Sequence, residues 1–146
     1  MSTHMNLGFN ASLNTESNMR KSIILSLFCA LLAISCQSNA QEKETDIKTL
    51  QAKITSEEQF ILLDVRTPAE YEAGHLKNAI NINWHSDEFK AKVSKLDKSK
   101  TVYVYCRSGR RSANASEAMR KMGFKKALNV EGGILAWKKE GFKTVQ

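Results

Sequence analysis

Thr101-Val-Tyr-Val-Tyr-Cys106-Arg-Ser-Gly-Arg-Arg-Ser112 joins an apolar run to a short loop that is dense in positive charge. The run is typical of a β-strand, Gly109 is typical of a turn, and a helical pattern begins near Ser112. This order places Cys106 between the end of a strand and the start of a helix. Helix N-termini and nearby arginines lower the pKa of a cysteine thiol from its free value of about 8.5. The segment therefore predicts a reactive thiolate at Cys106 rather than an inert buried cysteine.

The pattern on both sides of this segment alternates strands with helices. Strands are expected at 60–65, 79–82, 101–105 and 127–130, and helices at 47–54, 68–73, 89–96, 112–122 and 134–137. This alternation predicts an α/β fold with a parallel sheet. In such sheets the reactive residues lie at the carboxyl ends of the strands, and Cys106 falls at such an end.

Residues 19–40 have the features of an export signal. Arg20 and Lys21 precede an apolar stretch at 23–34, which is too short for a transmembrane span. Two processing sites stay open: cleavage after Ala40, or a lipoprotein-type site with a lipid anchor at Cys36. We therefore expect an exported protein that is either periplasmic or a membrane-anchored lipoprotein. Residues 1–18 are expected to be a disordered upstream extension, and 41–45 a linker to a single domain at 46–146.

The charge and the cysteine count limit the kinds of site that this domain can hold. The 146 residues include 22 Lys and Arg against 15 Asp and Glu, a net charge of +7. No nucleic-acid-binding motif accompanies the basic residues, so we expect no nucleic-acid partner. Cysteines stand at 29, 36 and 106, which leaves Cys106 alone in the expected domain. A structural disulfide or a metal site of several cysteines is thereby excluded there, and an exposed Cys106 thiolate would be prone to over-oxidation.

Several segments together resemble the single-domain rhodanese-like sulfurtransferase family. They are, in order, Leu63-Asp-Val-Arg66 with Glu70-Tyr71 and Gly74-His75, then Ala79-Ile-Asn-Ile82, Tyr105 to Ser112, Gly123-Phe124, and Gly132-Gly-Ile134 with Ala136-Trp137. The resemblance covers 46–142 and implies a three-layer α/β/α fold around a five-stranded parallel sheet. It also implies that Cys106 takes a sulfane sulfur from thiosulfate, a persulfide or a polysulfide. The sulfur is held as a persulfide and passed to cyanide or a thiol, without a metal or another cofactor.

The same resemblance assigns a loop whose backbone amides surround the persulfide. Its residues are Arg107, Ser108, Gly109, Arg110 and Arg111. Because thiosulfate is a dianion and sulfite leaves, cations beside the thiol would recruit the donor and stabilise the leaving charge. Arg107 and Arg111 are the leading candidates for this contact, with Arg110 as a third. The expected partners are a small anionic sulfur donor, a thiol or cyanide acceptor, and a possible protein that accepts sulfur or reduces the thiol.

Two alternative functions stay open. A phosphatase or arsenate reductase uses a similar cysteine loop, but such phosphatases carry an arginine where this chain has Ser112, and their loop is one residue longer. A non-catalytic rhodanese-like module that binds a partner would need neither Cys106 nor the arginines. The polar residues outside the loop are expected to be structural: an Asp64–Arg66 brace, a turn at His75, a surface His85, a helix-start charge at Glu70, and a tight turn at Gly132-Gly133.

Overall fold

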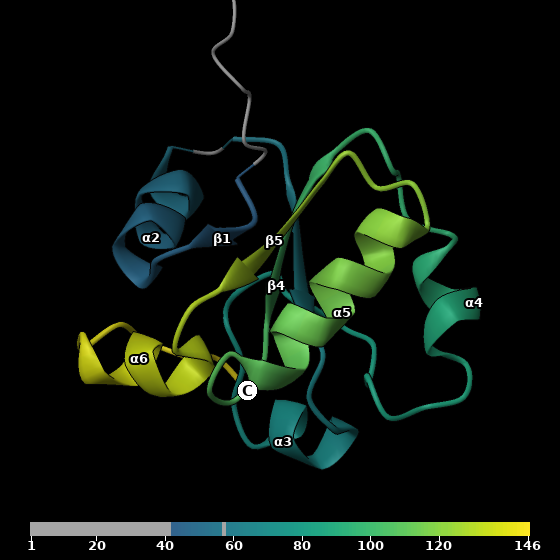
Figure 1. The fold of residues 1–146 in the computed structure, drawn as a ribbon. Coiled ribbons are helices and arrows are strands. Elements are labelled where there is room, and N and C mark those ends of the chain that lie inside the picture. Colours follow the sequence, from purple (N-terminus) through teal and green to yellow (C-terminus); the bar gives the residue numbers. More distant parts are fainter. Residues whose placement is uncertain (1–41, 57) are drawn as a thin grey trace, which may run out of the picture. The chain divides into compact units, whose positions relative to one another are not determined.

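The computed structural model describes residues 42–56 and 58–146 of the chain. Five parallel strands form one sheet in the order β1-β5-β4-β2-β3, with helices between them (Figure 1). The elements are β1 (Glu44–Thr45), α2 (Ile47–Thr55), β2 (Ile61–Asp64), α3 (Pro68–Glu72), β3 (Ile80–Asn81), α4 (Phe89–Val93), β4 (Thr101–Tyr105), α5 (Arg110–Lys121), β5 (Lys126–Val130) and α6 (Gly133–Lys139). The α/β class and the five-stranded parallel sheet expected from the sequence are confirmed.

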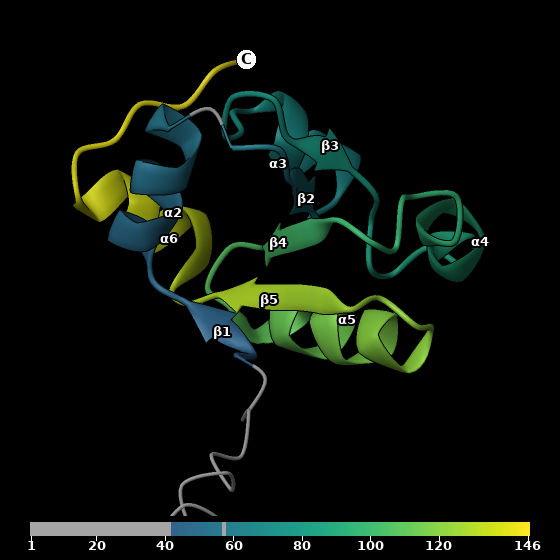
Figure 2. The ribbon, with the colours of Figure 1, turned by 90° about the horizontal axis from the view of Figure 1, so that it is seen from above.

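The central strand β4 contributes to a hydrophobic core on each face of the sheet. Successive side chains of a strand point to opposite faces, so Val102 and Val104 join the core under α4 and α5. Tyr103 and Tyr105 join the core under α2 and α6 on the other face. Figure 2 shows α2 and α6 together on the side away from α4 and α5. Each fully buried aliphatic side chain contributes about 1.5–3 kcal/mol of transfer free energy, so these two cores fix the position of β4.

The sheet begins earlier in the chain than the sequence pattern predicted. Glu44–Thr45 forms the edge strand β1, where the carbonyls of Lys43 and Thr45 each accept a backbone hydrogen bond of 2.9 Å from the β5 side of the sheet. The expected linker at 41–45 is therefore wrong for its last two residues. Glu44 and Thr45 are both polar, so the apolar run that marks the other strands is absent from this one.

The expected upstream extension at 1–18 and export signal at 19–40 lie outside the described residues. Within 42–56 and 58–146 no helix is long and apolar enough to cross a membrane.

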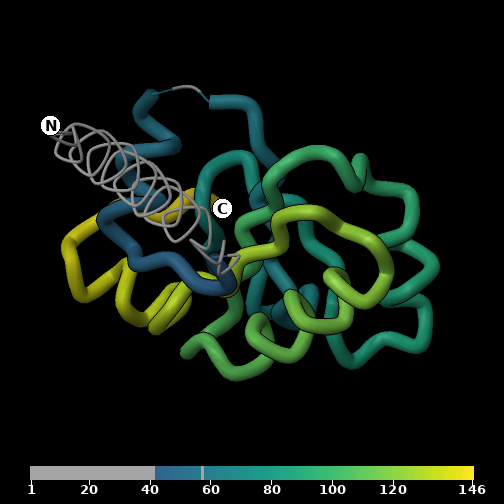
Figure 3. The backbone as a smooth tube through the Cα atoms, turned by 45° about the horizontal axis from the view of Figure 1, so that its top comes forward, coloured from purple at the N-terminus to yellow at the C-terminus, as the bar shows by residue number. Residues whose placement is uncertain are grey.

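The C-terminal segment that follows α6 returns to the turn at His75, whose backbone exchanges hydrogen bonds of 2.8 and 2.9 Å with Val145 (Figure 3).

Two helix starts are fixed by side chains that the sequence places there. Asp46 accepts hydrogen bonds of 2.8 and 2.9 Å from the first amides of α2. Thr67 and Glu70 form a reciprocal capping box around Pro68 at the start of α3. By contrast, Gly109 begins α5 without a side-chain cap. The free amides at the start of α5 are thus available to the loop that precedes it.

Candidate active site

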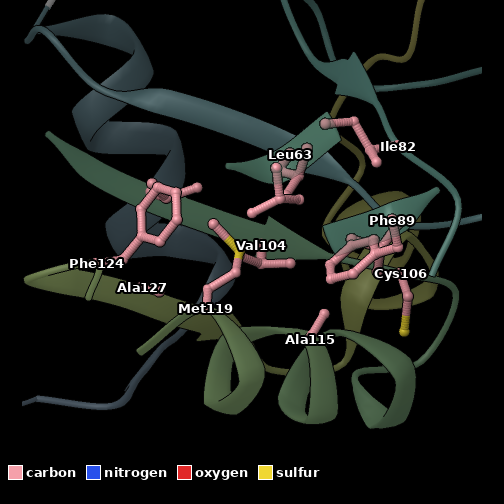
Figure 4. Packing of buried hydrophobic residues seen from close by; sticks show 12 residues of the cluster. Leu63, Ile82, Phe89, Val104, Cys106, Ala115, Met119, Phe124 and Ala127 are labelled. Carbon is pink, nitrogen blue, oxygen red and sulfur yellow. The ribbon is translucent and has the colours of Figure 1, made fainter. Parts of the chain in front are cut away.

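A short loop carries the chain from the end of β4 into α5. Cys106 follows Tyr105 directly, and α5 begins at Arg110. Gly109 has a φ of 100°, which a residue with a side chain rarely adopts, so glycine permits the turn that brings the helix start back beside the cysteine. Figure 4 shows Cys106 at the edge of the core under α5, with its sulfur toward the first turn of that helix.

Hydrogen-bond donors converge on the sulfur of Cys106. The backbone N–H of Gly109 lies 3.1 Å from Sγ, and the hydroxyl of Ser112 lies 3.4 Å from it. Burial raises the pKa of the Cys106 thiol, but the hydroxyl of Ser112 and the amides of Ser112, Ser108 and Gly109 together lower the pKa by more. The net pKa is below that of an ordinary thiol. The lowering predicted from the sequence is present, and its largest causes are these donors, although Arg111 also interacts favourably with the Cys106 thiolate.

The thiol lies at the floor of a cavity of about 320 Å³. Cys106 has only 1 % of its surface exposed, so the exposed thiolate expected from the sequence is wrong. The walls of the cavity are strongly basic: they are formed by His85, Arg107, Ser108, Arg110 and Arg111. A small anion that enters this cavity therefore meets a positively charged lining beside the sulfur.

The three arginines of the loop differ in how their charge is used. The guanidinium of Arg111 makes two hydrogen bonds of 2.7 and 2.8 Å to the carboxylate of Glu70 on α3. The hydrogen bonds from Arg111, with smaller contributions from Thr67, lower the pKa of Glu70 to about 2. In the described part of the chain, the side chains of Arg107 and Arg110 have no such partner. The uncompensated positive charge at the cavity thus comes from Arg107 and Arg110 rather than from Arg111.

Ser112 is positioned by β5. Its hydroxyl lies 2.7 Å from Oδ1 of Asn129 and 3.0 Å from the carbonyl oxygen of Gly109. Asn129 in turn donates to Glu44 on β1 over 3.3 Å. Ser112 is fully buried, so these contacts fix its oxygen beside the sulfur, and its single proton is donated to one of the three acceptors at a time.

The start of α6 packs directly against the loop at 106–109 between β4 and α5, here called the cysteine loop. The backbone N–H of Ile134 donates to the carbonyl of Cys106 at 2.9 Å, and that of Leu135 donates to the carbonyl of Arg107 at 3.1 Å. A Cβ on Gly133 would come within 2.8 Å of the Arg107 carbonyl and closer still to the carbonyl oxygen of Cys106. Only a glycine allows this approach.

The comparison with protein families agrees with this arrangement. The family model described as the rhodanese-like domain matches residues 46–140. The chain belongs to the rhodanese-like domain family. A protein of Allochromatium vinosum named sulfurtransferase is 34 % identical over 102 residues, which cover 70 % of this chain and 94 % of that protein.

Solved structures show the same rhodanese-like fold. A rhodanese-related protein from Thermoplasma volcanium has a TM-score of 0.62 and 34 % identity, covering 70 % of this chain and 97 % of the other. The rhodanese-like domain of an Anabaena protein has a TM-score of 0.65 and 30 % identity, covering 72 % and 80 %. Membership of this family and the sulfurtransferase among its relatives support sulfur transfer as the general activity.

The rhodanese-like domain brings all the expected loop residues to one place. Cys106, Arg107, Ser108, Arg110 and Arg111 line the cavity, and Gly109 contributes the amide nearest to the sulfur. Over residues 42–56 and 58–146 there is no cluster of metal-ligating side chains.

Sequence reasoning missed four contributors to the site. They are Glu70, His85, Ser112 as a donor to the thiol, and Asn129. Each except Ser112 comes from another element of the fold. Only Ser112 had a local signal, because a hydroxyl in the first turn of the helix stands close to the N-terminal amides.

The buried brace expected at Asp64 and Arg66 is present. The Arg66 guanidinium lies 2.6 Å from the Asp64 carboxylate and donates to the carbonyl of Gly74 at 2.8 Å. His75 stacks on Tyr71 with ring centroids 3.7 Å apart, and it does not line the thiol cavity. The Asp64–Arg66 pair therefore fixes the loop after β2, and His75 takes part in a structural turn as expected.

Proposed function

We propose that this rhodanese-like protein is a sulfurtransferase that carries a sulfane sulfur as a persulfide on Cys106. One observation carries the proposal: a thiol with a lowered pKa forms the floor of a cavity whose wall holds two uncompensated arginines. The thiolate supplies the nucleophile, and the arginines supply charge for an anionic donor. Thiosulfate is the donor that we propose as the test substrate.

In the first half-reaction, the Cys106 thiolate attacks the outer sulfur of thiosulfate. A bond forms between Sγ and that sulfur, the sulfur–sulfur bond of thiosulfate breaks, and sulfite leaves with the bonding electron pair. The total charge stays the same, because the thiolate and the thiosulfate dianion give a persulfide anion and a sulfite dianion. Arg107 and Arg110 stabilise the charge that develops on sulfite. The donors around Sγ, the Gly109 amide among them, then hold the persulfide.

In the second half-reaction, cyanide or a thiolate attacks the outer sulfur of the persulfide. The bond to Sγ breaks, and its electron pair returns to Cys106 as the thiolate. No general base is needed for the enzyme thiol, since its pKa is already lowered. The two half-reactions predict ping-pong kinetics.

A mass measurement tests this proposal. The full-length protein is incubated with thiosulfate, freed of donor and weighed, and a digest then locates any added mass. We expect one sulfur atom on the peptide that holds Cys106, none there in Cys106→Ser, and its removal by cyanide. If Cys106 takes up no sulfur from thiosulfate, a persulfide or a polysulfide, while phosphate esters are hydrolysed, the sulfurtransferase proposal is wrong and the phosphatase reading holds.

We also propose that residues 19–40 export the protein, so that the thiol functions outside the cytoplasm. Support comes from the sequence alone, in the charged start and the apolar stretch of this segment. The mass of the mature N-terminus distinguishes a lipid-modified Cys36 from a chain that begins at Gln41. A cytoplasmic protein that keeps residues 19–40 would contradict the proposal.

A further inference from the structure

A second, shallower cavity of about 220 Å³ lies beside the thiol cavity, and Arg107 lines both. Its apolar surface comes from Ile134 and Leu135 at the start of α6, together with Ala73 after α3. Leu135 has 49 % of its surface exposed, although it is a large hydrophobic side chain. A donor as small and charged as thiosulfate has no apolar part to contact this surface.

The charges around this second cavity are not balanced. Arg66 and Glu70 also line it, but each is neutralised in an ion pair, with Asp64 and Arg111 respectively. Arg107 and Lys138 have no hydrogen-bond or ion-pair partner for their side chains among the described residues. This second cavity, called the groove from here on, therefore presents two unpaired cationic side chains, Arg107 and Lys138, next to an apolar surface. A ligand that fits it carries negative charge and a nonpolar portion.

Backbone hydrogen bonds connect the apolar wall of the groove to the loop that holds the Cys106 sulfur. The amides of Ile134 and Leu135 donate to the carbonyls of Cys106 and Arg107. The apolar wall of the groove and the cysteine loop thus keep a fixed relation. A molecule held on α6 is placed beside the loop that carries the sulfur.

We propose that this groove binds the sulfur acceptor, and that the acceptor is a thiol that carries carboxylates. The inference rests on the proposed sulfurtransferase function and assigns the acceptor subsite of the same loop. Its carboxylates contact Arg107 and Lys138, its methylene groups contact Leu135, and its thiolate attacks the outer sulfur of the persulfide. That attack forms the acceptor persulfide and breaks the bond to Cys106 Sγ, which leaves as a thiolate, so no oxidant or reductant is consumed.

Acceptor charge is the variable that the test changes. The full-length protein is first loaded with sulfur from thiosulfate and freed of donor, and its sulfur content is measured by mass. It is then mixed with glutathione or with glutathione diethyl ester, which has the same thiol but no free carboxylates. The loss of the persulfide is followed in time, and each rate constant is normalised to the measured thiolate fraction of the acceptor. Because the protein is already loaded, differences in the donor step do not enter.

Lys138→Glu and Lys139→Glu form a matched pair of variants. Both residues are exposed neighbours on α6 and both substitutions change the net charge equally, but only Lys138 lines the groove. We expect wild type and Lys139→Glu to prefer glutathione over its diester by about threefold to tenfold, and less at high salt. Lys138→Glu should lose or reverse this preference.

The outcomes separate the two proposals. Equal rates with both acceptors in the wild type, or equal preferences in the two variants, would overturn the acceptor groove while leaving the persulfide intact. Failure of Cys106 to take up sulfur at all would overturn both proposals.

Discussion

At Cys106, fixed dipoles stabilise the thiolate more than the charged side chains of the loop do. The amide of Gly109 and the hydroxyl of Ser112 lie within hydrogen-bond distance of Sγ. Arg111 also interacts with the thiolate, but its guanidinium is paired with Glu70. Such dipoles are in place before the substrate arrives, so they need no reorganisation during the reaction. In the proposed mechanism the unpaired arginines, Arg107 and Arg110, are left to contact the anionic donor. That mechanism assigns the stabilisation of the thiolate and the recruitment of the donor to different neighbouring residues.

Ser112→Ala tests the first task. Loss of the hydroxyl removes a donor to Sγ, so we expect the pKa of the Cys106 thiol to rise, and sulfur uptake from thiosulfate to slow by about threefold to tenfold below that pKa. The thiol is titrated by the ultraviolet absorbance of the thiolate. Ser116→Ala is the matched control, because Ser116 is equally buried on α5 but its hydroxyl has no hydrogen-bond partner. An unchanged pKa in Ser112→Ala would contradict this role.

Arg110→Gln tests the second task. Arg110 lines the thiol cavity without a partner in the described chain, so its loss should lower kcat/KM for thiosulfate by about threefold to tenfold, with a weaker salt dependence than wild type. Lys121→Gln removes the same charge at the far end of α5 and should change neither quantity. If both variants behave alike, Arg110 acts only through net charge.

Among the elements, those marked by an apolar run or by a helix-start residue were predictable from the sequence, and β1, which has neither mark, was not. The apolar run before Cys106 predicted β4, and Pro68 predicted the start of α3. β1 was missed because Glu44 and Thr45 are both polar, so no apolar run marks the strand. The same limit applies to the site: Asn129 reaches Ser112 only because β5 lies beside β4 in the sheet. Contacts of this kind depend on the topology, which local patterns do not encode.

Gly133→Ala tests the contact between α6 and the cysteine loop. The added Cβ would collide with the carbonyls of Cys106 and Arg107, so we expect a loss of roughly 2–4 kcal/mol in the free energy of unfolding and a sharp fall in sulfur uptake. Gly141→Ala is the control: Gly141 also has a positive φ of 79°, but nothing lies within 4 Å of its Cβ position. It should lose only about 1 kcal/mol and keep its activity. If Gly133→Ala and Gly141→Ala lowered the free energy of unfolding and the sulfur uptake equally, the strained φ would explain both losses, and the contact with the cysteine loop would not be needed.

At the scale of the whole molecule, the site is assembled where several elements converge at one edge of the sheet. α5 lies over one face of the sheet and α6 over the other (Figure 1). α5 follows the cysteine loop in the chain, and the first turn of α6 donates hydrogen bonds to the same loop. α3 is joined to this arrangement by the ion pair between Glu70 and Arg111. Because that pair joins α3 to α5, protonation of the Glu70 carboxylate lowers the free energy of unfolding of the whole domain and does not act on the loop alone.

Glu70→Gln tests this link through the pH dependence of folding. Arg111, with hydrogen bonds from the backbone and hydroxyl of Thr67, holds the pKa of Glu70 at about 2 in the folded protein, against an ordinary value of 4.5. A lowered folded-state pKa stabilises the fold above pH 4.5, and the contribution is lost as the pH falls from there to about 2. In urea unfolding at neutral pH, the free energy of unfolding of wild type should therefore exceed that of Glu70→Gln by about 1–2 kcal/mol, after allowance for solvent screening of this partly buried pair. The difference should shrink across that acid window. Glu72→Gln is the matched control: it removes a carboxylate of the same helix that forms no ion pair within 42–56 and 58–146. A Glu70→Gln difference that does not change with pH would mean that the carboxylate acts through packing or helix capping rather than through its charge.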